Sequence, residues 1–140
     1  METPTPSRRW FQFSLLAVFV AVALIAVAVR VGMDYHALLS DIDGAWMGTG
    51  VQQGLTIQFE RKVLTLTNRA GSFDSAFEVY PANHSIRIIS DRGEQVGLYR
   101  LEGDVLELRV SSIGKPAPRS IEPSSKEPGT VYYYLKRQSR

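Results

Sequence analysis

Residues 97–108, GLYRLEGDVLEL, hold two short alternating patterns separated by a turn. Tyr99 and Leu101 lie two positions apart before the turn, and Leu106 and Leu108 lie two positions apart after it. A period of two places alternate side chains on opposite faces of a β-strand. The Gly-Asp pair between the patterns suits a tight turn, because Gly tolerates a positive φ and Asp caps the bend. The stretch therefore predicts an antiparallel hairpin with one buried face and one wet face.

The same alternation recurs on both sides of this hairpin, from Trp46 to Leu135. Eight such strands in about 95 residues predict a meander, and closing a meander into a barrel removes its exposed edges. The predicted fold class is therefore all-β, a small eight-stranded up-and-down barrel. The apolar residues of the eight strands are Trp46; Leu55, Ile57 and Phe59; Leu64 and Leu66; Phe73, Phe77 and Val79; Ile86 and Ile88; Tyr99 and Leu101; Leu106, Leu108 and Val110; and Val131, Tyr133 and Leu135.

One connection is much longer than the others. Residues 111–130, SSIGKPAPRSIEPSSKEPGT, contain four prolines and little apolar material. A proline has no backbone N–H and forces the preceding residue into an extended conformation, so regular structure is disfavoured here. We expect this Pro-rich loop to form an irregular flap over the last pair of strands.

The chain that precedes the barrel is strongly apolar. Residues 10–29 include no charged side chain. As a helix they would be about 30 Å long, which is the thickness of a bilayer's hydrocarbon core. We therefore expect a cytoplasmic tail over residues 1–9, one transmembrane signal-anchor helix over 10–32, a linker over 33–43 and the β-barrel domain over 44–137. The lipid bilayer is the partner predicted for residues 10–29.

Two other readings of this segment stay open. The stretch SRRWF, from Ser7 to Phe11, matches the opening of a twin-arginine export signal. The small residues of Ala26-Val27-Ala28 would suit cleavage of an ordinary signal peptide near Ala28. An uncharged run of 20 residues is longer than the roughly 7–15 of a signal peptide's apolar region, which favours an uncleaved anchor.

The charges that flank the segment predict its orientation. Arg8 and Arg9 precede it, and Arg30 alone follows it before several acidic residues. Basic residues close to a membrane span favour the cytoplasmic side. We expect a single-pass protein of the cell membrane with a cytoplasmic N-terminus and an extracytoplasmic C-terminal domain.

The composition argues against several classes of function. The net charge is +2, and basic and acidic residues alternate along the C-terminal part of the chain. A nucleic-acid-binding protein would present a basic stripe, so no nucleic acid is expected as a partner. The absence of cysteine excludes disulfides, a thiolate nucleophile and a zinc–thiolate site. The two histidines, His36 and His84, lie far apart in the sequence, and we predict no catalytic residue, no metal site, no cofactor and no enzymatic activity.

Several short motifs are similar to those of a known family. Gly44-Ala45-Trp46 has the G-x-W form of lipocalin-type barrels. Residues 97–108, followed by the GKPAP turn at 114–118 and the final Leu135-Lys136-Arg137, resemble a lipocalin-like domain family of unknown function from planctomycete bacteria. The RRWFQFSL stretch resembles the N-terminal anchors of planctomycete membrane proteins. The signature residues that carry the resemblance are Gly44, Trp46, Gly97, Tyr99, Leu101, Gly103, Asp104, Leu106, Gly114 and Pro116.

The resemblance implies a small lipocalin-like domain of exported or membrane proteins, and it implies no activity and no catalytic residue. Turn chemistry and core packing also account for every signature residue. Large side chains that are expected to point inward, such as Phe59 and Phe73, favour a filled barrel interior. We therefore expect a non-enzymatic structural or interaction module of the cell envelope, which presents Tyr132 and Tyr134 to another envelope protein. The alternative is a binding module whose mouth, beside the Pro-rich loop, accepts a small apolar or amphipathic ligand.

Overall fold

The computed structural model describes residues 8–139, and the chain divides after His36 into two compact units. Helix α1 extends from Arg8 to Ile42. Within the described part of the chain, its stretch Leu15–Ile42 is the one segment long and apolar enough to cross a membrane. Apolar side chains all around it are exposed, as expected of a helix that needs lipid as its solvent. The expected apolar helix is therefore confirmed.

The bounds of this helix differ from those expected. The helix begins at Arg8, and residues 1–7 of the expected tail lie outside the described residues. The segment 33–43, expected as a linker, is helical up to Ile42. The side chain of Ile42 is 1% exposed and packs into the core of the C-terminal unit. The last turns of α1 thus belong to the folded domain.

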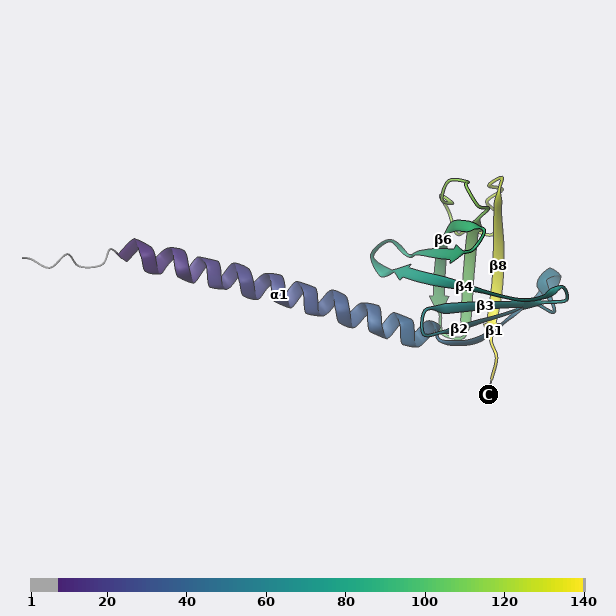
Figure 1. Cartoon of the computed structure of the whole chain (residues 1–140), viewed down its shortest axis with the longest axis horizontal. Coiled ribbons are helices and arrows are strands. Elements are labelled where there is room, and N and C mark those ends of the chain that lie inside the picture. Colours follow the sequence, from purple (N-terminus) through teal and green to yellow (C-terminus); the bar gives the residue numbers. More distant parts are fainter. Residues whose placement is uncertain (1–7, 140) are drawn as a thin grey trace, which may run out of the picture. The chain divides into compact units, whose positions relative to one another are not determined.

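The C-terminal unit is a closed barrel in which each strand pairs antiparallel with the next and β8 closes on β1 (Figure 1). This confirms the predicted eight-stranded up-and-down barrel. Short 3-10 turns follow β1 at Gly50–Gln52 and β4 at Pro81–Asn83. The strands are β1 Gly44–Gly48, β2 Thr56–Glu60, β3 Val63–Asn68, β4 Gly71–Tyr80, β5 Ser85–Ser90, β6 Gly93–Glu102, β7 Val105–Ser111 and β8 Thr130–Arg137.

The alternating topology gives the barrel two distinct ends. One end, which we call the closed end, carries Gly44 and the connections 61–62, 81–84 and 103–104. The opposite end, which we call the mouth, carries the connections 49–55, 69–70, 91–92 and 112–129.

The closed end holds the densest part of the core. Trp46 is fully buried, and its indole Nε1–H donates a hydrogen bond of 2.8 Å to the carbonyl oxygen of Ile42. Phe59 and Phe77 pack edge to face, with ring centroids 5.0 Å apart. Buried aromatic side chains of this size contribute much of a small domain's stability. The filled interior that the sequence predicts is therefore present at this end.

The Pro-rich loop packs against the outer face of β7 and β8. Arg109 on β7 is only 3% exposed, because the loop covers it. Its guanidinium donates to the carbonyl oxygens of Glu122, at 2.6 Å, and Ser125, at 2.9 Å, and lies over the ring of Tyr132 on β8. The flap expected over the last pair of strands lies there, held by the buried Arg109 and by the ion pair of Arg100 with Glu122 at 3.3 Å.

Candidate functional site

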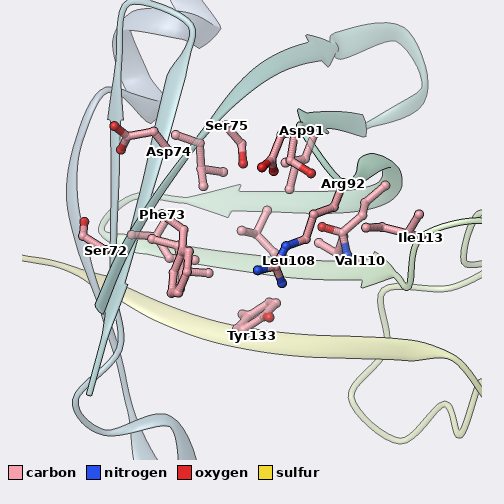
Figure 2. A pocket seen from close by; sticks show the side chains of 16 residues that line it. Ser72, Phe73, Asp74, Ser75, Asp91, Arg92, Leu108, Val110, Ile113 and Tyr133 are labelled. Atoms are coloured by element: carbon pink, nitrogen blue, oxygen red, sulfur yellow. The ribbon is translucent and has the colours of Figure 1, made fainter. Parts of the chain in front are cut away.

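The barrel interior is open at the mouth, where a cavity of about 530 Å³ lies between the strands (Figure 2). We call it the mouth cavity. Its walls come from β2 to β8, and its volume falls within the range of small-molecule sites. The interior is therefore filled at one end and hollow at the other.

Inward positions of the strands make the apolar part of the wall. Leu64 and Leu66 contribute from β3, and Leu108 and Val110 contribute from β7. These residues follow the period of two that the sequence shows, so the alternation that builds the core also lines the cavity. The wall is thus an extension of the core toward solvent.

The inward face of β4 shows why space remains at this level. Its inward residues run from Phe73 through Ser75 to the buried Phe77. Phe73, which is expected to fill the interior, is 47% exposed and borders the cavity instead. Ser75 points into the cavity (Figure 2), and a side chain this small leaves volume that a large one would occupy.

Arg92, in the turn between β5 and β6, extends its guanidinium into the cavity (Figure 2). Among residues 15–139 this guanidinium makes no ion pair and no hydrogen bond. By contrast, Arg87 pairs with Glu78 and Glu94, and Arg100 pairs with Glu107. Arg92 thus presents an unused cation and several free N–H donors to the cavity.

Tyr133 on β8 presents a second free donor. Its ring is half-buried in the cavity wall (Figure 2), and its hydroxyl makes no hydrogen bond to the described side chains or backbone. Burial raises the pKa of Tyr133 above its ordinary value, because desolvation disfavours the phenolate. The phenol is therefore protonated at neutral pH and can donate a hydrogen bond.

The carboxylates near the mouth are placed differently. Asp74 turns its carboxylate away from the cavity (Figure 2) and accepts a hydrogen bond of 2.7 Å from the hydroxyl of Thr65. Asp91 lies in the exposed β5–β6 turn at the rim. Among residues 15–139, the Asp91 carboxylate makes no ion pair and no hydrogen bond. The uncommitted polar groups of the cavity are therefore Arg92, Tyr133, the small hydroxyl of Ser75 and the carboxylate of Asp91.

The Pro-rich loop reaches the mouth only at its start. Ile113 borders the cavity and packs so closely on Gly93 that a Cβ at Gly93 would lie 2.8 Å from its Cγ2. The rest of the loop lies over the outer wall, where Arg109 holds it. The loop thus shapes the rim of the mouth through a single apolar residue.

The N-terminal signature residues lie at the closed end. Gly44 has φ +127, which favours glycine, and it lets the chain enter β1 directly after the helix. The guanidinium of Arg137 lies 4.3 Å from the centre of the Trp46 ring and donates to the carbonyl oxygen of Asp43 at 3.0 Å. Arg137 also pairs with Asp104 at 3.3 Å. These residues fasten the last strand to the entry of the first.

The remaining signature residues are structural as well. A Cβ at Gly97 would lie 2.6 Å from the carbonyl oxygen of Arg109, so only glycine lets β6 approach β7 here. Tyr99 and Leu106 are buried, Leu101 is half-buried, Gly103 has φ +58 in its turn, and Gly114 and Pro116 lie exposed in the Pro-rich loop. The signature residues and the mouth cavity therefore do not coincide.

Sequence reasoning missed Arg92 and Tyr133 as residues of a site. Arg92 reads as a solvated turn residue, and Tyr133 reads as an ordinary member of an alternating strand. Only the barrel's closure brings the β5–β6 turn and β8 around one space. His84 packs edge to face on Tyr99, and the described residues contain no group of three or more His, Cys, Asp or Glu side chains arranged to hold a metal ion.

Comparisons of this chain with protein-family models, with curated proteins and with solved structures gave no match. The resemblance to a planctomycete lipocalin-like family accordingly stays a prediction from the quoted motifs. What the structure establishes is an apolar N-terminal helix followed by a closed eight-stranded antiparallel barrel with a cavity at its mouth.

Proposed function

We propose that this protein is a membrane-anchored binding module whose barrel mouth holds a small amphipathic molecule. The mouth cavity carries the proposal, because it combines an apolar wall with a few polar groups that no described residue satisfies. Sites for small molecules have this composition, in which the apolar surface supplies affinity and the polar groups supply orientation. The length and apolar surface of α1 support anchoring in a bilayer.

The binding module takes precedence over the interaction module because of two observations. The interior is hollow at the mouth. Tyr132, one of the two tyrosines expected to contact a partner, is engaged within the domain: its hydroxyl donates to Glu107, and Arg109 lies over its ring. The interaction role, the extracytoplasmic placement and the absence of enzymatic activity stay predictions.

The binding of a neutral amphiphile tests this proposal. The full chain is placed in nanodiscs, and radiolabelled decanol is titrated by equilibrium dialysis against nanodiscs that hold no protein. We expect saturable binding of one decanol per barrel. Ser75→Trp should abolish it, because an indole at this inward position fills the cavity.

Ala76→Trp is the matched control. Ala76 is the next residue of β4, and it is exposed on the opposite face of the strand. This variant should bind decanol as the natural sequence does, while circular dichroism verifies that both variants keep the sheet. If the natural sequence takes up no decanol above the protein-free background, the proposed function is wrong.

A further inference from the structure

Two strong hydrogen-bond donors of the mouth cavity have no partner among residues 15–139. Arg92 contributes a guanidinium, and Tyr133 contributes a protonated phenol from another part of the barrel wall. Two other polar side chains of the lining are engaged: Gln95 donates to the carbonyl oxygen of Ser111 at 3.0 Å, and Ser90 donates to that of Gly93 at 3.0 Å. The Ser75 hydroxyl and the Asp91 carboxylate also line the cavity, and among residues 15–139 neither makes a hydrogen bond or an ion pair. The free donors of the cavity are therefore Arg92 and Tyr133, together with the Ser75 hydroxyl, while Asp91 is a free acceptor in the β5–β6 turn.

Arginines elsewhere on the surface do not share this arrangement. Arg61 and Arg69 also lie in turns, but neither lines the mouth cavity. Arg92 differs because its guanidinium points between apolar residues such as Leu108 (Figure 2). Arg92 as a whole is exposed at the mouth, and its guanidinium can pair with an anion through charge-assisted hydrogen bonds, which are stronger than neutral ones.

We propose that the ligand of the mouth cavity is a single-chain amphiphile with an anionic headgroup, a carboxylate or a phosphate monoester, bound by Arg92 and Tyr133. The inference rests on the proposed function, since it names the chemistry of the molecule that the cavity holds. The headgroup accepts hydrogen bonds from the guanidinium and the phenol. The chain packs along the apolar wall that includes Leu66, Phe73 and Ile88.

Four ligands of equal chain length separate the contribution of the headgroup to the affinity from that of the alkyl chain. The full chain in nanodiscs is titrated with decanoate, decyl phosphate, decanol and decylamine, each corrected for uptake by nanodiscs without protein. We expect one or both anions to bind about tenfold or more tightly than decanol, because a hydrogen bond to a charged group exceeds a neutral one by that order. Decylamine should bind more weakly than decanol. The ratio of decanoate to decyl phosphate distinguishes a carboxylate from a phosphate headgroup.

Substitutions then assign the preference to residues. Arg92→Gln should weaken binding of the preferred anion about tenfold or more and leave decanol within about twofold. Tyr133→Phe should weaken binding of the preferred anion severalfold and should also leave decanol binding within about twofold. Arg69→Gln, in the neighbouring turn at the mouth, is the matched control and should leave all four affinities unchanged.

The outcomes distinguish the two proposals. The assignment of an anionic headgroup is wrong if decanol binds but the anions bind no more tightly. It is also wrong if Arg92→Gln changes the affinities for decanol and decanoate equally. In both cases the proposed binding module stands. If decylamine is preferred, the headgroup is cationic and the inference is overturned. If none of the four ligands exceeds the protein-free background, the proposed function itself fails.

Discussion

At the scale of single residues, Trp46 connects three parts of the domain. Its ring fills the closed end, its Nε1–H donates to Ile42 at the end of α1, and Arg137 from β8 lies over its face. The helix end, the first strand and the last strand therefore meet on one side chain. Trp46 is consequently the residue whose loss should cost the domain most.

Trp46→Ala should lower the free energy of unfolding by about 3–5 kcal/mol, because it removes a fully buried aromatic side chain and leaves a cavity. Urea unfolding of the full chain in mild detergent, followed by the circular dichroism of the sheet, measures the change. Met47→Ala is the control, since Met47 is the next residue and is 45% exposed. It should change the stability by about 0.5 kcal/mol or less. Equal losses for both variants would show that Trp46 does not organise the closed end.

The residue scale also shows what alternation in a sequence can and cannot predict. The period of two correctly places Phe59, Phe73 and Phe77 on the inner face. It says nothing of how far along the barrel axis each residue lies, and Phe73 is half-exposed at the mouth for that reason. The cavity could not be predicted, because its volume depends on how side chains from seven strands meet.

At the scale of elements, the end of α1 differs most from expectation. The sequence predicts a linker at 33–43 because aspartates follow the apolar run. Leu38, Leu39 and Ile42 nevertheless repeat at helical spacing, and the burial of Ile42 against the core extends the helix to the barrel. Tertiary packing here outweighs the local tendency of the aspartates to end the helix.

The Pro-rich loop has few apolar side chains of its own, and its position depends on Arg109. Arg109→Met keeps an apolar stem but removes the hydrogen bonds to Glu122, Ser125 and Thr130. We expect trypsin to cleave the loop after Lys126 about tenfold or more faster in this variant, since cleavage requires the loop to open locally. Mass spectrometry of timed digests measures the rate.

Arg69→Met serves as the control for this experiment, because Arg69 lies exposed in a turn that is separate from the loop. It should leave cleavage after Lys126 unchanged. Circular dichroism should show an intact sheet in both variants, since Arg109 bonds to the loop outside the barrel ladder. A loop that is cleaved at the natural rate in Arg109→Met would mean that prolines, and not the buried guanidinium, hold its conformation.

At the scale of the whole molecule, the barrel is polarised between an end built for stability and an end that is open. Among the predicted signature residues, Gly44, Trp46 and Asp104 lie at the closed end, whereas Gly114 and Pro116 lie in the Pro-rich loop. The uncommitted donors Arg92 and Tyr133 lie at the mouth cavity. For this reason, the motifs of the sequence predict the fold but do not predict the cavity. Gly44, Trp46 and Asp104 serve the packing of this barrel, whereas Arg92 and Tyr133 come to line one cavity only after closure.

The orientation in the membrane is the prediction that belongs to the whole chain. The arginines before the apolar run favour a cytoplasmic N-terminus and an extracytoplasmic barrel. Because the chain has no cysteine, single cysteines report the side directly. Ser124→Cys, in the exposed part of the Pro-rich loop, should react with a membrane-impermeant maleimide on intact cells. Ser7→Cys, in the expected tail, should react only after the cells are opened.

The same pair of variants distinguishes the anchor from the other readings of the N-terminal segment. An uncleaved anchor keeps both labels on one chain of full mass. Cleavage near Ala28 would leave Ser124→Cys labelled on a shorter chain and remove the Ser7 label altogether. Labelling of Ser7→Cys on intact cells, with Ser124→Cys protected from the reagent, would show that the orientation is the reverse of the predicted one. The mouth would then draw its amphiphile from the cytoplasm, and the charge bias of two arginines against one would have been too small to predict the topology.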